Sequence, residues 1–208
     1  MTLPHLSMRA TVGVASLVLA VAGTRVAAAT PGFPGDPHRW LLRFVRRLVA
    51  DLRTGETTAG WIVFGVVAVT VSVCHFVGIR AELYHTIAWW DLLTHSLGGI
   101  GVAGLAYLTH RGREVPVGSV WWVVPSVFAI GSGFEVYEFL FKSFWYDLTL
   151  RTYAVDTVVD LAVNTSGATL VAATVSVVES AGVGDSDESV TDDERQIDPR
   201  DPDESVDT

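Results

Sequence analysis

The sequence is poor in cysteine and lysine, and both shortages narrow what the protein can be. Cys74 is the single cysteine among 208 residues, which excludes an internal disulfide and a zinc cage built from cysteines. Lys142 is the single lysine beside thirteen arginines. This preference for arginine, together with an acidic C-terminal segment, suggests a halophilic, salt-adapted source. A recognisable hydrolase or phosphotransferase motif and an internal repeat are also missing.

Acidic charge is scarce outside the C-terminal segment. Residues 179–208 hold twelve Asp and Glu against two Arg, a balance of −10, so the rest of the chain is near +1 although the net charge is −9. A segment with few apolar residues and dense negative charge cannot bury enough surface to fold. We therefore predict a disordered acidic tail over 179–208.

Apolar residues are what the sequence has in abundance. They make up 50% of the chain, and the mean hydropathy is +0.39. Because about 20 mostly apolar residues cross a bilayer, five stretches qualify as spans. These are roughly 10–29, 58–79, 88–108, 119–141 and 155–178. We predict an all-α fold, a polytopic membrane helix bundle with about five transmembrane helices.

The first apolar stretch has two interpretations. Residues 1–30 fit a signal peptide with small residues at a cleavage site, or a retained first transmembrane helix. Arginines cluster between the first and second spans, and such clusters stay cytoplasmic. They are Arg39, Arg43, Arg46, Arg47 and Arg53. We therefore expect a retained helix with the N-terminus outside, in a multi-pass protein of the cell (plasma) membrane whose acidic tail is cytoplasmic.

The segment 31–57 contains an amphipathic pattern. Apolar residues recur at helical spacing in it, with the arginines on other faces: Leu41, Phe44, Val45, Leu48 and Leu52. This pattern predicts a helix on the membrane surface whose partners are the lipid bilayer and its anionic headgroups. The alternative is a short helix packed on other cytoplasmic parts. The basic patch is short and adjoins a span, so we expect no nucleic-acid partner.

The segment 58–178 is predicted to form a four-helix membrane core with a polar site. Three spans carry ionisable groups three or four residues apart, which share one helix face. They are Asp91 with His95, Glu135 with Glu138, and Asp156 with Asp160, followed by Asn164. The first and third sets begin their helices and the second ends an antiparallel one. All three stripes should therefore meet at one side of the membrane, the outer side in the orientation given above.

The surplus of carboxylates requires compensation. A charged side chain at mid-membrane costs about 2.5–3.5 kcal/mol, so these acids must be protonated, paired, hydrated or bound to a cation. An oxygen-rich set with one imidazole suits a divalent metal cation such as Mg²⁺, Mn²⁺, Ca²⁺, iron or zinc. The candidate metal ligands are Asp91, His95, Glu135, Glu138, Asp156 and Asp160.

Simpler explanations exist for several of these residues. Carboxylates near helix ends, such as Asp156 and Glu138, can cap a helix or face headgroup water. Asn164 is expected to hydrogen-bond to a neighbouring helix. His75, in the second span, could hydrogen-bond within the bundle or join the site, and we assign it as a packing residue.

Small residues are expected to let the acidic stripes approach one another. They are Gly98, Gly99, Gly101 and Gly104 in the third span, and Gly131, Gly133, Gly167 and Ala168 in the fourth and fifth.

The order of these motifs resembles the YjdF-like family of multi-pass inner-membrane proteins, which is distantly similar to VanZ-like membrane proteins. The resemblance covers residues 84 to 170 and rests on WDLLTHSLGG, FEVYEF and DTVVDLAVNTSGA. It implies an integral membrane protein with a polar site inside the membrane, and it implies no particular reaction.

Three functions stay open at this point. In the first, a metal-dependent enzyme acts on a lipid headgroup or small-molecule ligand, with Glu135 or Asp160 activating water and His95 as ligand or acid–base group. In the second, a proton- or ion-coupled carrier uses Asp91, Glu135 and Asp160, and a homo-oligomer would compensate for the small number of spans. In the third, the polar cluster holds together a scaffold that catalyses nothing.

Overall fold

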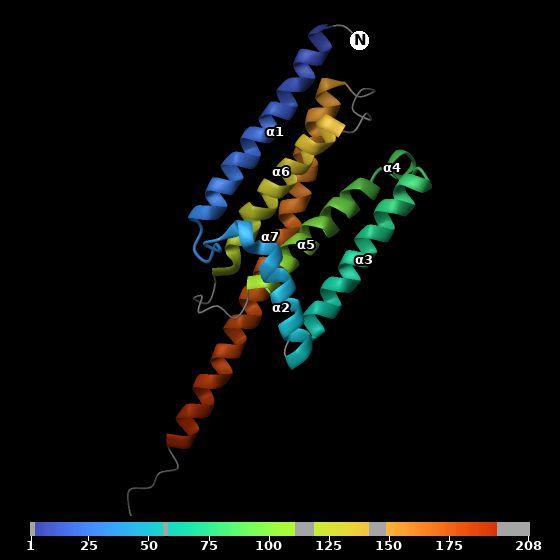
Figure 1. Cartoon of the computed structure of the whole chain (residues 1–208). Helices are drawn as coiled ribbons and strands as arrows, with labels where there is room; N and C mark the ends of the chain where they lie inside the picture. The colour runs from blue at the N-terminus through green and yellow to red at the C-terminus, as the bar shows by residue number, and fades with distance from the viewer. Residues whose placement is uncertain (1–2, 56–57, 111–118, 142–148, 195–208) are drawn as a thin grey trace, which may run out of the picture.

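The protein is all-α in the part of the chain that the structure, a computed structural model, describes. That part comprises residues 3–55, 58–110, 119–141 and 149–194. The elements in chain order are α1 (Leu3–Ala29), η1 (Pro37–Arg39), α2 (Trp40–Thr54), α3 (Thr58–Arg80), α4 (Leu83–Thr86), α5 (Trp90–His110), η2 (Ser119–Trp122), α6 (Val123–Phe141) and α7 (Leu150–Glu194). Figure 1 shows these elements as an elongated bundle with α4 and the N-terminus towards one end and α2 towards the other.

Five helices are long and apolar enough to cross a membrane, which confirms the predicted polytopic helix bundle. The qualifying segments are Ala10–Ala29, Ala59–Arg80, Trp90–His110, Val120–Phe141 and Leu150–Ala181. Their surfaces show why the bundle needs lipid around it. On α3, for example, Val63 and Phe76 are 64% and 69% exposed. Apolar side chains exposed over the length of a helix are stable only against hydrocarbon.

The helices are arranged around α5, α6 and α7. Helix α7 packs on both α5 and α6, α1 packs along α6, and α3 packs on α5 at the opposite edge of the bundle (Figure 1). A buried apolar cluster lies where α5, η2, α6 and α7 meet: Ala103, Ala106, Val120, Trp122, Val123, Val127, Ala168 and Ala172.

Two glycines set the close approach of α5 and α7. A Cβ atom on Gly99 would overlap the backbone of Asn164, and one on Gly167 would lie 2.6 Å from the carbonyl oxygen of Ser96. The expected role of small residues holds at these positions. It is wrong for Gly104 and Gly133, where a Cβ would meet nothing within 4 Å. At about 100° per residue, these two glycines point away from the faces that Gly99 and Gly131 present.

Helix α2 is amphipathic, as predicted, but it has two distinct faces rather than one apolar stripe. The inner face packs on α3, with the Phe44 and Trp61 rings 5.8 Å apart. The outer face carries exposed apolar residues: Leu41, Leu42, Val45, Val49 and Leu52. Phe44 was predicted to belong to the apolar side that meets the membrane surface, and this prediction is wrong, because its ring packs on α3. Spacing alone could not separate these faces, because apolar residues occur on both.

A buried carboxylate fixes α2 to α3. Asp51 is 3% exposed and accepts a hydrogen bond of 2.9 Å from Trp61 Nε1. Arg47 Nε lies 3.0 Å from the other oxygen of the same carboxylate. The pair satisfies a charge that would otherwise be costly to bury.

We expect Asp51→Ala to weaken this attachment. The substitution leaves the Trp61 N–H without its acceptor, and a hydrogen bond to a charged group contributes about 1.5–3 kcal/mol. Unfolding in mixed micelles with increasing SDS measures the loss. Asp36→Ala is the matched control, because Asp36 also pairs with an arginine of α2, Arg43, but is 52% exposed. Its effect should stay below about 1 kcal/mol, and equal losses would show that the burial of Asp51 is irrelevant.

Helix α7 begins at Leu150 and continues to Glu194, beyond the predicted end at residue 178. The first half of the acidic segment is therefore helical, contrary to the expected disorder from residue 179. The first proline after Leu150 is Pro199, so no proline interrupts this helix. Residues 195–208, the rest of the predicted tail, lie outside the described residues, as do Lys142, Arg111 and Arg113.

Candidate metal centre at the junction of three helices

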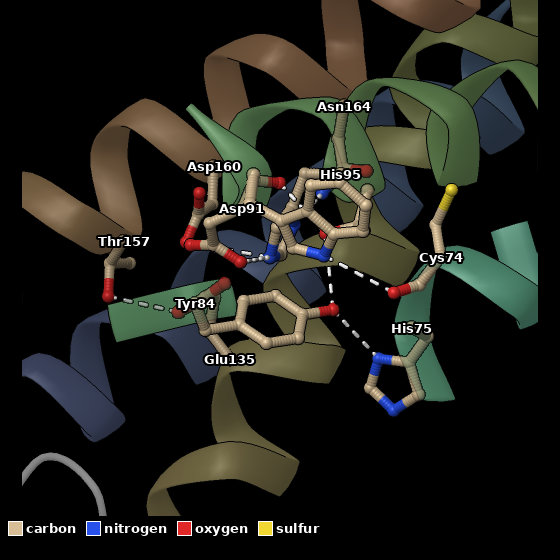
Figure 2. Close-up of polar contacts among 11 residues, drawn as sticks. Cys74, His75, Tyr84, Asp91, His95, Glu135, Thr157, Asp160 and Asn164 are labelled. Carbon is tan, nitrogen blue, oxygen red and sulfur yellow. Dashed lines mark hydrogen bonds and ion pairs between the residues drawn. The ribbon is translucent and has the colours of Figure 1, made fainter. Parts of the chain in front are cut away.

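The three predicted polar stripes meet at one end of the bundle. Asp91 and His95 lie in the first turns of α5, Glu135 lies in the second half of α6, and Asp160 lies near the start of α7. Because α6 runs antiparallel to the other two helices, these positions share one depth. Figure 2 shows the side chains of α5 and α7 converging.

Asp91, His95 and Asp160 form the tightest group. One ligand atom from each side chain lies within 4.8 Å of the others. His95 Nε2 is 3.5 Å from Asp91 Oδ1 and 3.6 Å from Asp160 Oδ2 (Figure 2). Ligand atoms about 2.1 Å from a metal at tetrahedral angles stand roughly 3.4 Å apart, so both separations match a shared cation. The Asp160 side chain is 5% exposed and that of Asp91 is 34% exposed, so the group has a buried and a more open side.

The second nitrogen of His95 is held by Asn164. Asn164 Nδ2 lies 3.1 Å from His95 Nδ1, and Asn164 is itself buried. This contact confirms the predicted hydrogen bond from Asn164 to a neighbouring helix. An asparagine amide can present either its NH₂ or its oxygen by rotation. It can therefore accept from Nδ1–H when Nε2 binds a metal, as the outer partners of metal-bound histidines do.

Glu135 lies beside this group but is held separately. It is 2% exposed, and its Oε2 accepts a hydrogen bond of 3.0 Å from Thr157 of α7. Its Oε1 is buried and has no hydrogen-bond partner among the residues that the structure describes. A buried carboxylate with one satisfied and one unsatisfied oxygen is suited to accept a proton or a further ligand.

A second polar chain approaches the group from α3. His75 Nδ1 lies 3.0 Å from Tyr84 Oη, and that hydroxyl donates to Thr94 Oγ1 over 3.5 Å. Thr94 in turn donates to the backbone carbonyl of Asp91. Burial raises the pKa of the Tyr84 phenol, which therefore stays protonated and able to donate. His75 is thus part of a polar chain, so the hydrogen bond within the bundle, rather than the assignment as a packing residue, describes it.

Three of the six predicted ligands do not join the three-residue group. Glu138 and Asp156 are half-buried, and the group contains neither of them. Both lie closer to the helix ends than Glu135 and Asp160 do. Glu135 is the third predicted ligand outside the group, for the separate reason given above.

Sequence analysis missed three residues of the site. Thr157 precedes Asp160 by three residues on the same helix face, so its spacing could have identified it. Thr94 follows Asp91 by three residues and gave the same signal, whereas Tyr84 gave none. Tyr84 lies in α4, a four-residue helix between two spans, where periodicity cannot be read.

The group has a clear chemical preference. Two carboxylates and one imidazole carry two negative charges when the imidazole is neutral, which a divalent cation would balance. Ca²⁺ and Mg²⁺ favour shells made of oxygen alone, whereas an imidazole suits Mn²⁺, iron or zinc. The arrangement can therefore hold a transition metal through three protein ligands, with positions left for water or substrate.

Comparison with known proteins identifies the family. No curated protein and no solved structure matches the chain. A family model described as "Predicted membrane protein (DUF2238)" matches residues 10–181. This range includes all five candidate spans and every residue of the site, and it extends well beyond the 84–170 stretch that carried the expected resemblance. The chain therefore belongs to the DUF2238 family of membrane proteins.

Proposed function

We propose that this membrane protein binds one divalent transition metal through Asp91, His95 and Asp160 and uses it to act on the headgroup of a membrane lipid. The observation that carries the proposal is the placement of three ligand atoms, from two helices, within 4.8 Å of one another. Bringing two carboxylates together inside a bundle is unfavourable unless a cation compensates them.

The metal would supply Lewis acidity and lower the pKa of a bound water. Glu135 is the proposed base. Its Oε2 is oriented by Thr157, and its Oε1 is available to take the proton of that water. The sequence alone left either Glu135 or Asp160 to activate water. Here Asp160 is a metal ligand, and Glu135 alone is the base.

Aromatic residues of α6 support a lipid as substrate. The Phe134 ring stands edge-on to His95, with centroids 6.2 Å apart, and is 41% exposed. Tyr137 and Phe141 continue this row towards the end of α6, and each stacks at a tilt on the ring before it. The row connects the lipid-exposed surface to the histidine edge of the site. A headgroup at the interface would reach the metal along it.

The side of the membrane on which the site acts follows from the arginine distribution. With the arginines of α2 in the cytoplasm, the site faces the outer leaflet of the plasma membrane. We also propose, from the three sequence motifs, that the family is YjdF-like and distantly similar to VanZ-like membrane proteins.

The metal content of the purified protein tests the proposal. Elemental analysis after incubation with Mn²⁺, Fe²⁺ and Zn²⁺ should find close to one equivalent per chain. Asn164→Leu, which removes the partner of His95 Nδ1, should bind the same metal about 10–100-fold more weakly, because outer partners orient the ligand. A wild-type protein that retains no divalent metal under any of these conditions would overturn the proposal.

A proton-coupled carrier is the second candidate. The chain from His75 through Tyr84 to Thr94 favours it, because it brings a titratable group and two hydroxyls to the turn of α5 that carries Asp91. Protein reconstituted in liposomes would then carry a pH-gradient-driven flux that Tyr84→Phe abolishes. A metal enzyme would show no such flux, and its activity would depend on Glu135 instead.

A further inference from the structure

A second site lies at the other end of the bundle, separate from the carboxylates. It is a cavity of about 180 Å³ between α1, α5, α6 and the start of α2. It lies against the C-terminal half of α5, at Val102, Ala106 and His110, whereas Asp91 and His95 occupy the first turns of that helix. Dry apolar cavities of about 150 Å³ take up molecules of the size of benzene.

Several polar groups of the cavity wall are satisfied within the protein. The hydroxyls of Thr24 and Ser126 donate to carbonyls of their own helices, and His110 Nδ1 lies 2.9 Å from the carbonyl oxygen of Ala106. Trp40 Nε1 is buried and has no acceptor in the described part of the chain. An indole N–H is a donor only, so an oxygen atom of a ligand would satisfy it.

A second unsatisfied donor lies one turn further along α2. Arg43 Nη2 contacts the backbone oxygen of Asp36 and lies 3.5 Å from its carboxylate. Arg43 Nη1 is buried and unpartnered among the described residues. Residues three apart share a helix face, so Trp40 and Arg43 lie on the same face of α2. An apolar cavity with one unsatisfied donor in its wall, at Trp40, and a cationic one a turn away, at Arg43, fits an anionic head with an apolar chain.

The position of α2 places this site at the depth of lipid headgroups. Its outer face exposes a row of apolar residues that includes Leu41, Val45 and Leu52. Arg39, Arg46 and Arg53, at the flank of that row, are also exposed. A helix with this distribution lies in the interface with its arginines among anionic headgroups. Figure 1 shows α2 at the end of the bundle where α1 ends.

We propose that this cavity binds one anionic phospholipid, with an acyl chain among Val102, Ala106 and Ile130 and its phosphate accepting hydrogen bonds from Trp40 Nε1 and Arg43 Nη1. The proposal does not depend on the metal centre, and it assigns the lipid to the opposite leaflet from the proposed reaction.

The test measures binding of phosphatidylglycerol to the full-length protein in detergent by native mass spectrometry. Phosphatidylcholine and soluble glycerol phosphate serve as comparison ligands. We expect one phosphatidylglycerol to remain bound, at least about tenfold more tightly than phosphatidylcholine. Arg43→Gln should weaken binding about tenfold and Trp40→Phe about fivefold, in line with a charged and a neutral hydrogen bond. Ala106→Leu, which fills the cavity, should displace the lipid.

Arg46→Gln is the matched control, since it removes the same charge from the same helix at an exposed position. It should leave binding unchanged. Equal losses for Arg43→Gln and Arg46→Gln would overturn the site in favour of diffuse attraction to the helix. Equal affinities for the two phospholipids would also overturn it, as would glycerol phosphate binding as tightly as the lipid. Trp40→Phe keeps an aromatic ring while it removes the N–H donor, and it carries the test if Ala106→Leu does not fold.

Discussion

The Asp160→Asn variant is expected to bind divalent metal at least about 100-fold more weakly than the natural chain. Asp160 is the most buried of the three grouped residues, and its carboxylate lies 3.6 Å from His95 Nε2. An amide keeps the shape of the side chain but removes an anionic ligand. Loss of an outer partner already costs about 10–100-fold in affinity, so loss of a direct ligand should cost more. Equilibrium dialysis followed by elemental analysis gives the affinity.

Asp156→Asn is the matched control for this variant. Asp156 lies one turn before Asp160 on α7, carries the same charge, and is outside the three-residue group. It should keep metal affinity within about threefold of the natural chain. Equal losses in the two variants would mean that general negative charge, rather than a defined site, attracts the cation.

Stability of the metal-free proteins separates a metal site from a scaffold. In a metal site without its metal, the carboxylates repel one another and destabilise the fold. Metal-free Asp160→Asn should therefore melt at the same temperature as the natural chain or higher. A scaffold whose His95–Asp160 pair ties α5 to α7 would instead melt at a lower temperature, whether or not metal is added.

Gly99→Ala is expected to destabilise the bundle by about 1–3 kcal/mol, the usual effect of overpacking a tight interior. The new methyl group would overlap the carbonyl oxygen of Asn164, with Asn164 Cα and C only 2.9 Å away. These are backbone atoms, so the contact cannot be relieved by a rotamer change. Helices α5 and α7 would have to separate, and His95 would move away from Asn164 and Asp160.

Gly104→Ala in the same helix controls for the change of residue type. A Cβ there meets nothing within 4 Å, so alanine should be neutral or stabilise the protein by up to about 1 kcal/mol. Unfolding in SDS-containing micelles compares the two variants, and metal affinity should fall in Gly99→Ala alone. Equal stability of both variants would show that α5 and α7 do not need their close contact.

The sequence determined the membrane class, the five spans and the meeting of the polar stripes. The length of a span is set by the thickness of the bilayer. An apolar run of that length can be recognised in the sequence without knowing how the helices pack. The convergence of Asp91, Glu135 and Asp160 could also be predicted from the sequence, because antiparallel neighbours bring the start of one helix to the end of the next. Such inferences use only the position of a residue along its own helix.

Tertiary structure alone decided which of these residues touch. Whether Glu135 joins Asp160 or pairs with Thr157 depends on the rotation of α6 and α7 about their axes, and that rotation is set by packing at Gly99, Gly131 and Gly167. Helix periodicity gives the relative angle of side chains within one helix and says nothing about which angle faces a neighbour. The same limit hid the inner face of α2, where Asp51 meets Trp61, because an apolar pattern is the same whether a protein or a lipid covers it.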